Sequence, residues 1–268
     1  MMETRRSLPR LSVRAGVSLP GHRLLPEEVP VALSYNGSTH AVMMATPADL
    51  TDFARGFTLT EGIATPDEIQ SIEAVATDKG IDLQIWLTED AAQRQARRRR
   101  SMAGPVGCGL CGIDSLEEAA RIPPRLPPGS FTMTPHEVRA AIAGLEQHQP
   151  LHDATRAAHC AAFWSEGCIR AAREDVGRHN ALDKLIGALA GNAAQGALIL
   201  TCRTSIDMVQ KAAIAGFPVL IAVSAPTAAA VDLAAAAGLT LIALARPDSF
   251  EIFTHPTRIP PEESADVA

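Results

Sequence analysis

Residues 197–245, ALILTCRTSIDMVQKAAIAGFPVLIAVSAPTAAAVDLAAAAGLTLIALA, alternate between continuous apolar runs and runs with helical character. Apolar runs of this length are typical of parallel strands that are covered on both faces. The pattern predicts three strands and two helices, at 197–202, 205–215, 218–224, 227–237 and 239–245. This βαβαβ order places the chain in the α/β class, with a mainly parallel central sheet and right-handed connections.

The residues before this unit extend it. Thr134-Pro135 opens a predicted helix that reaches about Gln147, because Thr is a preferred N-cap and Pro is tolerated at the first helical position. A hairpin follows, with strands at 160–164 and 168–172, and then a helix over 180–189. We expect residues 130–258 to form one α/β domain that binds a cofactor.

The N-terminal part predicts a smaller α+β domain over residues 26–122. Asn36-Gly37 between two apolar runs is a strong hairpin signal, and Thr46-Pro47 should open a helix. Strands are expected at 28–33, 41–44, 69–75 and 81–87. Residues 1–25 show little periodicity and are expected to form a loose arm.

A polar segment with two cysteines closes this smaller domain. Residues 94–112 hold four consecutive arginines, Arg97 to Arg100, and the run Cys108-Gly-Leu-Cys111-Gly. Because this segment has many glycines and almost no hydrophobic pattern, we expect it to form an exposed loop. Asp114 or Ser115 then caps a short predicted helix, and a proline-rich linker follows.

Composition limits the class of protein. The chain has 268 residues, of which 47% are hydrophobic, with a formal net charge of −6, which argues against a general nucleic-acid binder. Its five cysteines are an odd number, which suits a reduced, cytoplasmic protein better than a disulfide framework. No signal peptide or membrane span is evident in the sequence.

The carboxyl edge of the predicted sheet is the expected ligand site, because ligands bind there in open α/β sheets. Two of the helices start at this edge, and helix N-termini favour anions such as phosphate. The candidates that follow the strands are Arg203, Ser224, Thr227 and the turn Leu244, Ala245, Arg246, Pro247, Asp248 and Ser249. Helix capping by Ser205 and Thr227 is the simpler alternative. The chain has neither GxGxxG nor a P-loop, so ordinary dinucleotide or ATP chemistry is not favoured.

A second polar stretch, residues 173–180 (REDVGRHN), joins a strand to a helix. Charges, a glycine, a histidine and an amide within eight residues indicate a site, and Arg178, His179 and Asn180 are its candidates. A solvated loop with Asn180 as N-cap is the alternative.

Two thiols at CxxC spacing can serve several purposes. Structural zinc needs four ligands, and the chain offers no second cysteine pair at that spacing. Thiol–disulfide exchange, a loop with unused cysteines and sulfur carriage remain open. A carrier cysteine must be exposed and stabilised as a thiolate, and the arginine run could lower its pKa.

The motifs together resemble the formate dehydrogenase accessory sulfurtransferase (FdhD) family. The segments that carry the resemblance are Asn36-Gly37, 44–47, 55–57 with 61–62, 108–112, 173–184, 203–205, Lys211 and 224–227. The resemblance implies a small N-terminal domain, a cytidine-deaminase-like α/β domain without its zinc ligands, and usually a homodimer.

The resemblance also implies a function. Members take sulfur from a cysteine desulfurase as a persulfide on the loop cysteines, here Cys108 and Cys111. They pass it to the molybdenum (or tungsten) bis-molybdopterin guanine dinucleotide cofactor of formate dehydrogenase, whose guanine ends lie on the α/β domain. Arg156 and Asp248 depart from the family pattern near that region. The competing functions are a non-enzymatic cofactor chaperone for formate dehydrogenase and a thiol–disulfide oxidoreductase. No metal site, nucleic acid or membrane is expected.

Overall fold

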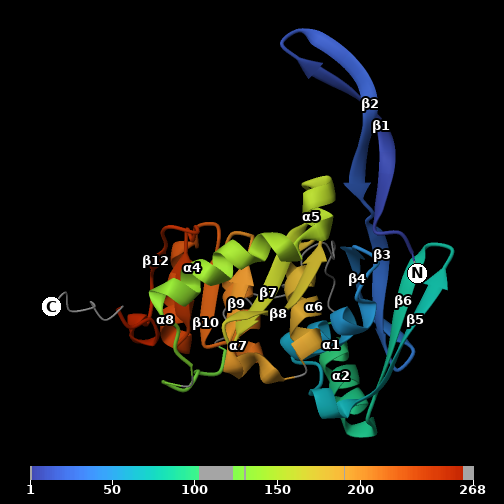
Figure 1. Cartoon of the computed structure of the whole chain (residues 1–268). Helices are drawn as coiled ribbons and strands as arrows, with labels where there is room; N and C mark the ends of the chain where they lie inside the picture. The colour runs from blue at the N-terminus through green and yellow to red at the C-terminus, as the bar shows by residue number, and fades with distance from the viewer. Residues whose placement is uncertain (1, 103–122, 130, 190, 262–268) are drawn as a thin grey trace.

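A six-stranded sheet lies at the centre of the C-terminal half (Figure 1). The computed structural model describes residues 2–102, 123–129, 131–189 and 191–261. The strand order is β12-β11-β10-β9-β7-β8, with β7 His159–Ser165, β8 Cys168–Asp175, β9 Ala197–Leu200, β10 Val219–Ala222, β11 Thr240–Ala243 and β12 Glu251–Ile252. β9, β10 and β11 are parallel, whereas β7, β8 and β12 pair antiparallel with their neighbours. The expected α/β class is confirmed, with a parallel centre and antiparallel edges.

Helices cover both faces of this sheet, as the continuous apolar strands require. Along β9, Leu198 and Leu200 pack in one hydrophobic cluster and Ala197 and Ile199 in another, because successive side chains of a strand point to opposite faces. The first cluster includes residues of α6 Arg178–Leu189, α7 Ile206–Ala215 and α8 Ala228–Ala237. The second includes residues of α4 Pro135–Gly144, whose Thr134 N-cap forms the predicted capping box with Glu137. The short helix α5 Pro150–Thr155 follows α4.

The N-terminal half is built on a four-stranded sheet in the order β4-β3-β6-β5. Its strands are β3 Val29–Tyr35, β4 Ser38–Ala45, β5 Ile69–Thr77 and β6 Gly80–Leu87, close to the predicted ranges. One face packs on α1 Leu50–Thr60 through Phe53, Ala54 and Phe57. The helix α2 Glu89–Met102 follows β6. Single 3-10 turns lie at Pro66–Glu68, Leu145–His148, Asn192–Gln195 and Pro256–Arg258.

The first 25 residues are not a loose arm, and that prediction is wrong. β1 Arg5–Arg14 and β2 Val17–Pro26 form a regular antiparallel hairpin that projects from the rest of the molecule (Figure 1). Its two-residue turn places Ala15 at φ 48° and Gly16 at φ 82°. Positive φ at both central residues is what a tight hairpin turn requires, and glycine meets that requirement without strain.

Two further boundaries differ from the prediction. The first helix begins at Leu50 rather than at Thr46-Pro47, because Asp49 takes a left-handed conformation and Thr46 bonds instead to the segment after β8. Residues 94–102 belong to α2 rather than to a loop, with Ala91 and Gln95 buried. Arginine is a good helix former, so the four-arginine run continues this helix. The helix predicted after Ser115 falls outside the described residues.

The two halves meet where α1 packs against α6. Gly56 of α1 lies against the backbone of Asp183, and Gly187 of α6 lies against the backbone of Asp52, so neither position has room for a Cβ atom. Glycine at both contact points lets the two helix backbones approach closely, which fixes how the N-terminal half sits on the C-terminal half.

Buried charges cross the same interface. Lys211 Nζ of α7 donates to both carboxylate oxygens of Asp183, at 2.9 and 3.0 Å, and to Glu61 and Thr60 of the N-terminal half. Nearby, the fully buried Lys184 Nζ lies 2.6 Å from Asp175 and donates to the Thr46 carbonyl at 2.9 Å. Two of the three lysines in the chain are thus buried at the interface between the two halves.

Candidate functional site

The carboxyl ends of four strands lie at one edge of the central sheet. β9, β10 and β11 are parallel, and β8 runs in the same direction because β8 and β9 are both antiparallel to β7. The connections that follow these strands therefore begin at this edge, here called the carboxyl edge. These connections and the first turn of α6 hold every predicted cofactor-binding residue: Arg178, His179, Asn180, Arg203, Ser224, Thr227 and 244–249.

The turns after β9 and β10 are hydrogen-bonded to each other. Thr204 pairs with Pro226 as an isolated bridge, and Thr227 donates its backbone N–H to the Thr204 carbonyl at 3.0 Å. Thr227 caps α8 by accepting from Ala230 N–H, so capping accounts for this side chain. Arg203 is exposed between these two helix starts. The arrangement offers an exposed cation beside two helix N-termini, which suits an anion.

The turn after β11 carries the remaining candidates. Arg246 donates from its guanidinium to the carbonyls of Val223, at 2.6 Å, and Ala245, at 2.8 Å. Backbone bonds between Arg246 and Ser249 close the turn, and Leu244 sits at φ 52°. The exposed residues are Leu244, Arg246, Pro247, Asp248 and Ser249, whereas Ala245 is buried. Arg246 thus braces the turn and still presents N–H donors to solvent, since a guanidinium carries five.

The segment after β8 divides into a buried and an accessible part. Asn180 is buried, and its amide donates to the Met44 carbonyl and to Asp175. Asp175 also accepts from the backbone N–H groups of Thr46 and Gly177. These contacts give Asn180 a role in holding the fold and leave it no accessible polar face. Arg178 and His179 are half-buried at the start of α6.

Asp207 is a member of this edge that the sequence prediction missed. It lies in the first turn of α7, and its carboxylate pairs with Nε2 of His179. Burial raises the pKa of Asp207, but the surrounding hydrogen bonds and positive charge, led by the hydrogen bond from His179, together outweigh burial and lower it. An acidic residue two positions after a helix N-cap was the only available signal, and that position is common for structural reasons alone.

Asp207→Asn should reduce the free energy of unfolding by about 2 kcal/mol at neutral pH, because a hydrogen bond to a charged group is lost. A lowered folded-state pKa gives stability that is fully present above the ordinary aspartate pKa of about 3.9 and fades as the pH falls further. The difference between wild type and variant should therefore shrink below that pH. Urea titrations between pH 7 and pH 3 measure it, and a difference that stays constant with pH would contradict the pairing.

His159, at the start of β7, is a second neighbour that the sequence did not indicate. Its imidazole is half-buried, and burial together with the positive charge of Arg178 lowers its pKa. His159 is thus biased toward the neutral form, while Arg178, Arg203 and Arg246 supply permanent positive charge along this edge.

Three cysteines fall within the described part of the chain, and two of them are unreactive. Burial raises the pKa of Cys160 to about 12 and that of Cys202 to about 11, so both are protonated thiols at neutral pH. Cys168 is exposed at the start of β8. The predicted catalytic pair, Cys108 and Cys111, lies outside the described residues.

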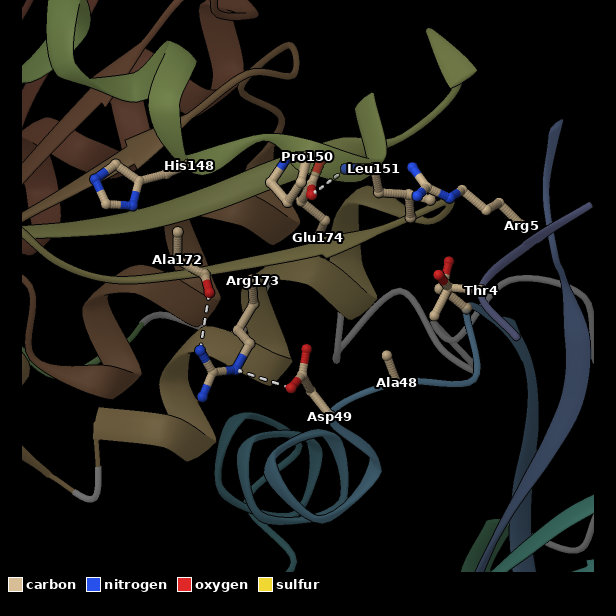
Figure 2. A pocket seen from close by; sticks show the side chains of 11 residues that line it. Thr4, Arg5, Ala48, Asp49, His148, Pro150, Leu151, Ala172, Arg173 and Glu174 are labelled. Atoms are coloured by element: carbon tan, nitrogen blue, oxygen red, sulfur yellow. Dashed lines mark hydrogen bonds and ion pairs between the residues drawn. The ribbon is translucent and has the colours of Figure 1, made fainter. Parts of the chain in front are cut away.

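A cavity of about 370 Å³ opens beside the carboxyl end of β8 (Figure 2). Arg173 bridges to Asp52 at 2.8 Å and to Asp49 at 3.6 Å, and Glu174 accepts the backbone N–H groups of Leu151 and His152 at 2.7 Å. Burial raises the pKa of Glu174. The lining residues are Thr4, Arg5, Thr46, Ala48, Asp49, His148, Pro150, Leu151, Ala172, Arg173 and Glu174. Both charged residues of β8 that line it are thus engaged in holding α1 and α5.

Within residues 2–102, 123–129, 131–189 and 191–261, no cluster of His, Cys, Asp and Glu is arranged to hold a metal ion. None of the helices in these ranges is both long and apolar enough to cross a bilayer.

Comparison with known proteins identifies the family. The sequence profile of the FdhD/NarQ family matches residues 26–260. This chain belongs to the FdhD/NarQ family. A curated member from Agrobacterium fabrum, named "Sulfur carrier protein FdhD", is 54% identical over 260 residues, which cover 95% of this chain and 96% of that protein. A member of the same name from Cupriavidus necator is 48% identical over 89% of this chain and 84% of its own length.

A solved structure agrees on the fold. The crystal structure of a chain assigned as a formate dehydrogenase accessory protein from Desulfotalea psychrophila matches with a TM-score of 0.75 and 24% sequence identity. The match covers 96% of this chain and 100% of that one, so the two chains share their fold over nearly their whole length. The family resemblance drawn from the sequence motifs is confirmed.

Proposed function

We propose that this chain is a sulfur carrier that sulfurates a molybdenum cofactor. Cys108 takes sulfur as a persulfide from a cysteine desulfurase, and Cys111 assists its release. The acceptor is the molybdenum bis-molybdopterin guanine dinucleotide cofactor, which is bound as cargo and then serves formate dehydrogenase. We further propose that the protein works in the cytoplasm as a homodimer.

The observation that carries this proposal is the intact Cys108-x-x-Cys111 pair in a chain 54% identical to a protein named as a sulfur carrier. The buried thiols Cys160 and Cys202 have raised pKa values, which makes them poor carriers. Elimination of these two supports the CxxC pair as the place where sulfur is held.

The carboxyl edge supports the cargo part of the proposal. The guanine nucleotide arms of the cofactor carry phosphates, and the edge presents Arg203 and Arg246 beside the starts of α7 and α8. Arginine forms charge-assisted, often bidentate hydrogen bonds with phosphate. Arg178 and His179 extend the same row of donors toward β8. The proposed roles of these residues are to bind and orient the nucleotide ends.

The proposed sulfur steps balance without an outside oxidant. The Cys108 thiolate attacks the terminal sulfur of the desulfurase persulfide, so one S–S bond breaks, one forms, and the desulfurase thiolate leaves. Cys111 then attacks the inner sulfur of the Cys108 persulfide. A Cys108–Cys111 disulfide forms, and the terminal sulfur leaves at the oxidation level of sulfide for the metal centre. A cellular dithiol reduces the disulfide for the next cycle.

Intact-mass measurement tests the carrier step. After incubation with a cysteine desulfurase and cysteine, wild type should gain the mass of a single sulfur atom, and a reductant should remove it. Cys108→Ala should lose the gain almost completely, because the attacking thiolate is gone. Cys168→Ala removes an exposed cysteine outside the motif and should keep the gain.

Three outcomes would contradict the proposal. They are no gain in wild type, a gain that follows Cys168 instead of Cys108, and normal formate dehydrogenase activation by Cys108→Ala. The last result would indicate a cofactor chaperone. Turnover of generic disulfides without a desulfurase would indicate an oxidoreductase.

A further inference from the structure

The β1–β2 hairpin differs from the rest of the chain in charge. Residues 4–26 contain five arginines, at 5, 6, 10, 14 and 23, and no aspartate or glutamate. Since the hairpin adds five positive charges to a chain of formal net charge −6, the remaining residues carry −11. A basic element attracts acidic surfaces. Because the rest of this chain is acidic, a second copy of the same molecule offers such a surface.

The hairpin also exposes apolar side chains on both faces. The register pairs Leu11 with Pro20 and Ser12 with Leu19, so Leu11 and Leu19 lie on opposite faces. The exposed fractions are 64% for Leu11, 66% for Val13, 58% for Val17 and 60% for Leu19. A ribbon of two strands is marginally stable in water by itself. Covering these side chains would stabilise the hairpin through burial of apolar area.

Contacts at its base tie the hairpin to its own molecule. Arg6 pairs with Glu27 at 2.9 Å, Glu27 N–H donates to Thr4, and Arg23 donates to the Thr155 carbonyl at 3.3 Å. Only residues 27 and 28 separate β2 from β3, so the hairpin leaves directly from the four-stranded sheet. Figure 1 shows the tip extending away from both halves.

A surface of matching character lies on the outer face of the four-stranded sheet. Val42, Met44 and Trp86 are 56%, 47% and 45% exposed there, opposite the face that packs on α1. Register places Asp82 and Val42 on either side of Ala32, and Glu73 beside Gln84 on the same face. This outer face thus combines exposed apolar side chains with negative charge.

We infer that two copies of this chain dock reciprocally, the β1–β2 hairpin of each lying on the outer face of the four-stranded sheet of the other. The inference rests on the homodimer of the proposed function and names its surface. A two-fold arrangement makes the same contact twice and closes, so the assembly stops at two copies. Arg10 and Arg14 share one face of the hairpin with Val17 and Leu19. On that face the arginines then oppose carboxylates of the sheet, and the two apolar side chains gain apolar neighbours.

The composition of the hairpin favours a protein over the other occupants of a basic surface. Residues 4–26 contain no Phe, Tyr or Trp. Proteins that bind single-stranded nucleic acid use aromatic side chains to stack bases, and aromatic residues mark the membrane interface. The alternation of apolar and charged side chains on two strands instead fits the face of another sheet.

Sedimentation equilibrium tests the inference with full-length protein. The double variant R10E/R14E reverses charge near the hairpin tip, and Val42→Arg places a positive charge on the outer sheet face, where it would oppose the hairpin arginines. Each should weaken self-association by at least about tenfold, since like charges then oppose or an apolar contact is lost. R125E/R170E reverses two exposed arginines elsewhere and should associate as wild type. Higher salt should weaken the wild-type dimer, because exposed charges are screened.

Mixing the two defective variants gives the decisive result. In a mixed pair, the intact hairpin of the Val42→Arg copy meets the intact sheet of the R10E/R14E copy, so one of the two contacts is restored. The mixture should therefore form heterodimers, visible by native mass spectrometry, more readily than either variant forms homodimers. Circular dichroism spectra like that of wild type show that both variants fold.

Each other outcome overturns the inference. A wild type that stays monomeric at every concentration removes the homodimer and this surface together, while the persulfide measurement still decides sulfur carriage. A dimer that R10E/R14E and Val42→Arg leave intact keeps the homodimer and rejects this surface. Binding of anionic vesicles or single-stranded nucleic acid that depends on the hairpin, with no change in self-association, assigns the hairpin to those partners instead.

Discussion

Lys211→Met should lower the free energy of unfolding by about 3–5 kcal/mol, because it leaves buried carboxylates without their cation. Asp183 is 1% exposed, and Lys211 Nζ bonds both of its oxygens and one oxygen of Glu61. Burial alone would lower the pKa of Lys211, but Asp183 and Glu61 outweigh burial and raise it, so the ammonium is charged when folded. Methionine is similar in length to the aliphatic part of the lysine side chain and carries no charge.

Guanidinium chloride titration of both proteins measures this effect. The matched control is Lys79→Met, which removes the only lysine that is exposed, in the turn between β5 and β6. Surface substitutions of that kind usually change stability by less than about 0.5 kcal/mol. A loss below about 1 kcal/mol for Lys211→Met would show that the buried carboxylates find other partners or protons.

Gly56→Ala should destabilise the protein by about 3 kcal/mol or more, at the upper end for overpacking. The added methyl group would overlap the carbonyl of Asp183 in α6, and this neighbour is backbone rather than a flexible side chain. Relief requires α1 and α6 to separate, which also loosens the Lys211 contacts to Thr60 and Glu61.

The control for this change is Gly144→Ala at the end of α4. A methyl group there would lie 3.7 Å from Ile169 Cδ1, which is ordinary van der Waals contact. We expect Gly144→Ala to be neutral or to stabilise by up to about 1 kcal/mol, because alanine restricts the unfolded chain more than glycine does. Equal melting temperatures for the two variants would mean that α1 and α6 are not held at this crossing.

Sequence reasoning located the elements whose patterns are dictated by burial. The strands of residues 197–245 are apolar because both faces are covered, and their helices end at glycines in the left-handed conformation, Gly216 and Gly238. Asn36-Gly37 correctly predicted the β3–β4 hairpin, because a tight hairpin turn needs positive φ at both central residues and both residues adopt it here.

The elements that were missed have patterns set by something other than burial. β1 and β2 carry Pro9, Pro20 and several arginines and turn at Ala15-Gly16, so neither strand periodicity nor a strong turn dipeptide marks them. The arginine run of α2 has high helix propensity but no long apolar stripe. Exposed elements of this kind leave little hydrophobic pattern to detect.

The candidate site was predictable as a location and less so as a set of roles. The rule that ligands gather at the carboxyl edge brought Arg203, Arg246 and the start of α6 together. The same rule could not distinguish a ligand-binding role from a structural one. Arg178 stays accessible, whereas the Asn180 amide donates its hydrogen bonds to Met44 and Asp175. That distinction depends on the packing of the N-terminal half against α6, which local sequence does not contain.

The hydrogen bonds that join the three turns at the carboxyl edge have a thermodynamic consequence. The turn after β9 is bonded to the turn after β10 through Thr204, and the latter is bonded to the turn after β11 through Ser224 and the Arg246 guanidinium. A ligand that settles on this edge meets loops that are already ordered, so little conformational entropy is lost when it binds. Affinity among related ligands should then vary mainly through how fast each one leaves.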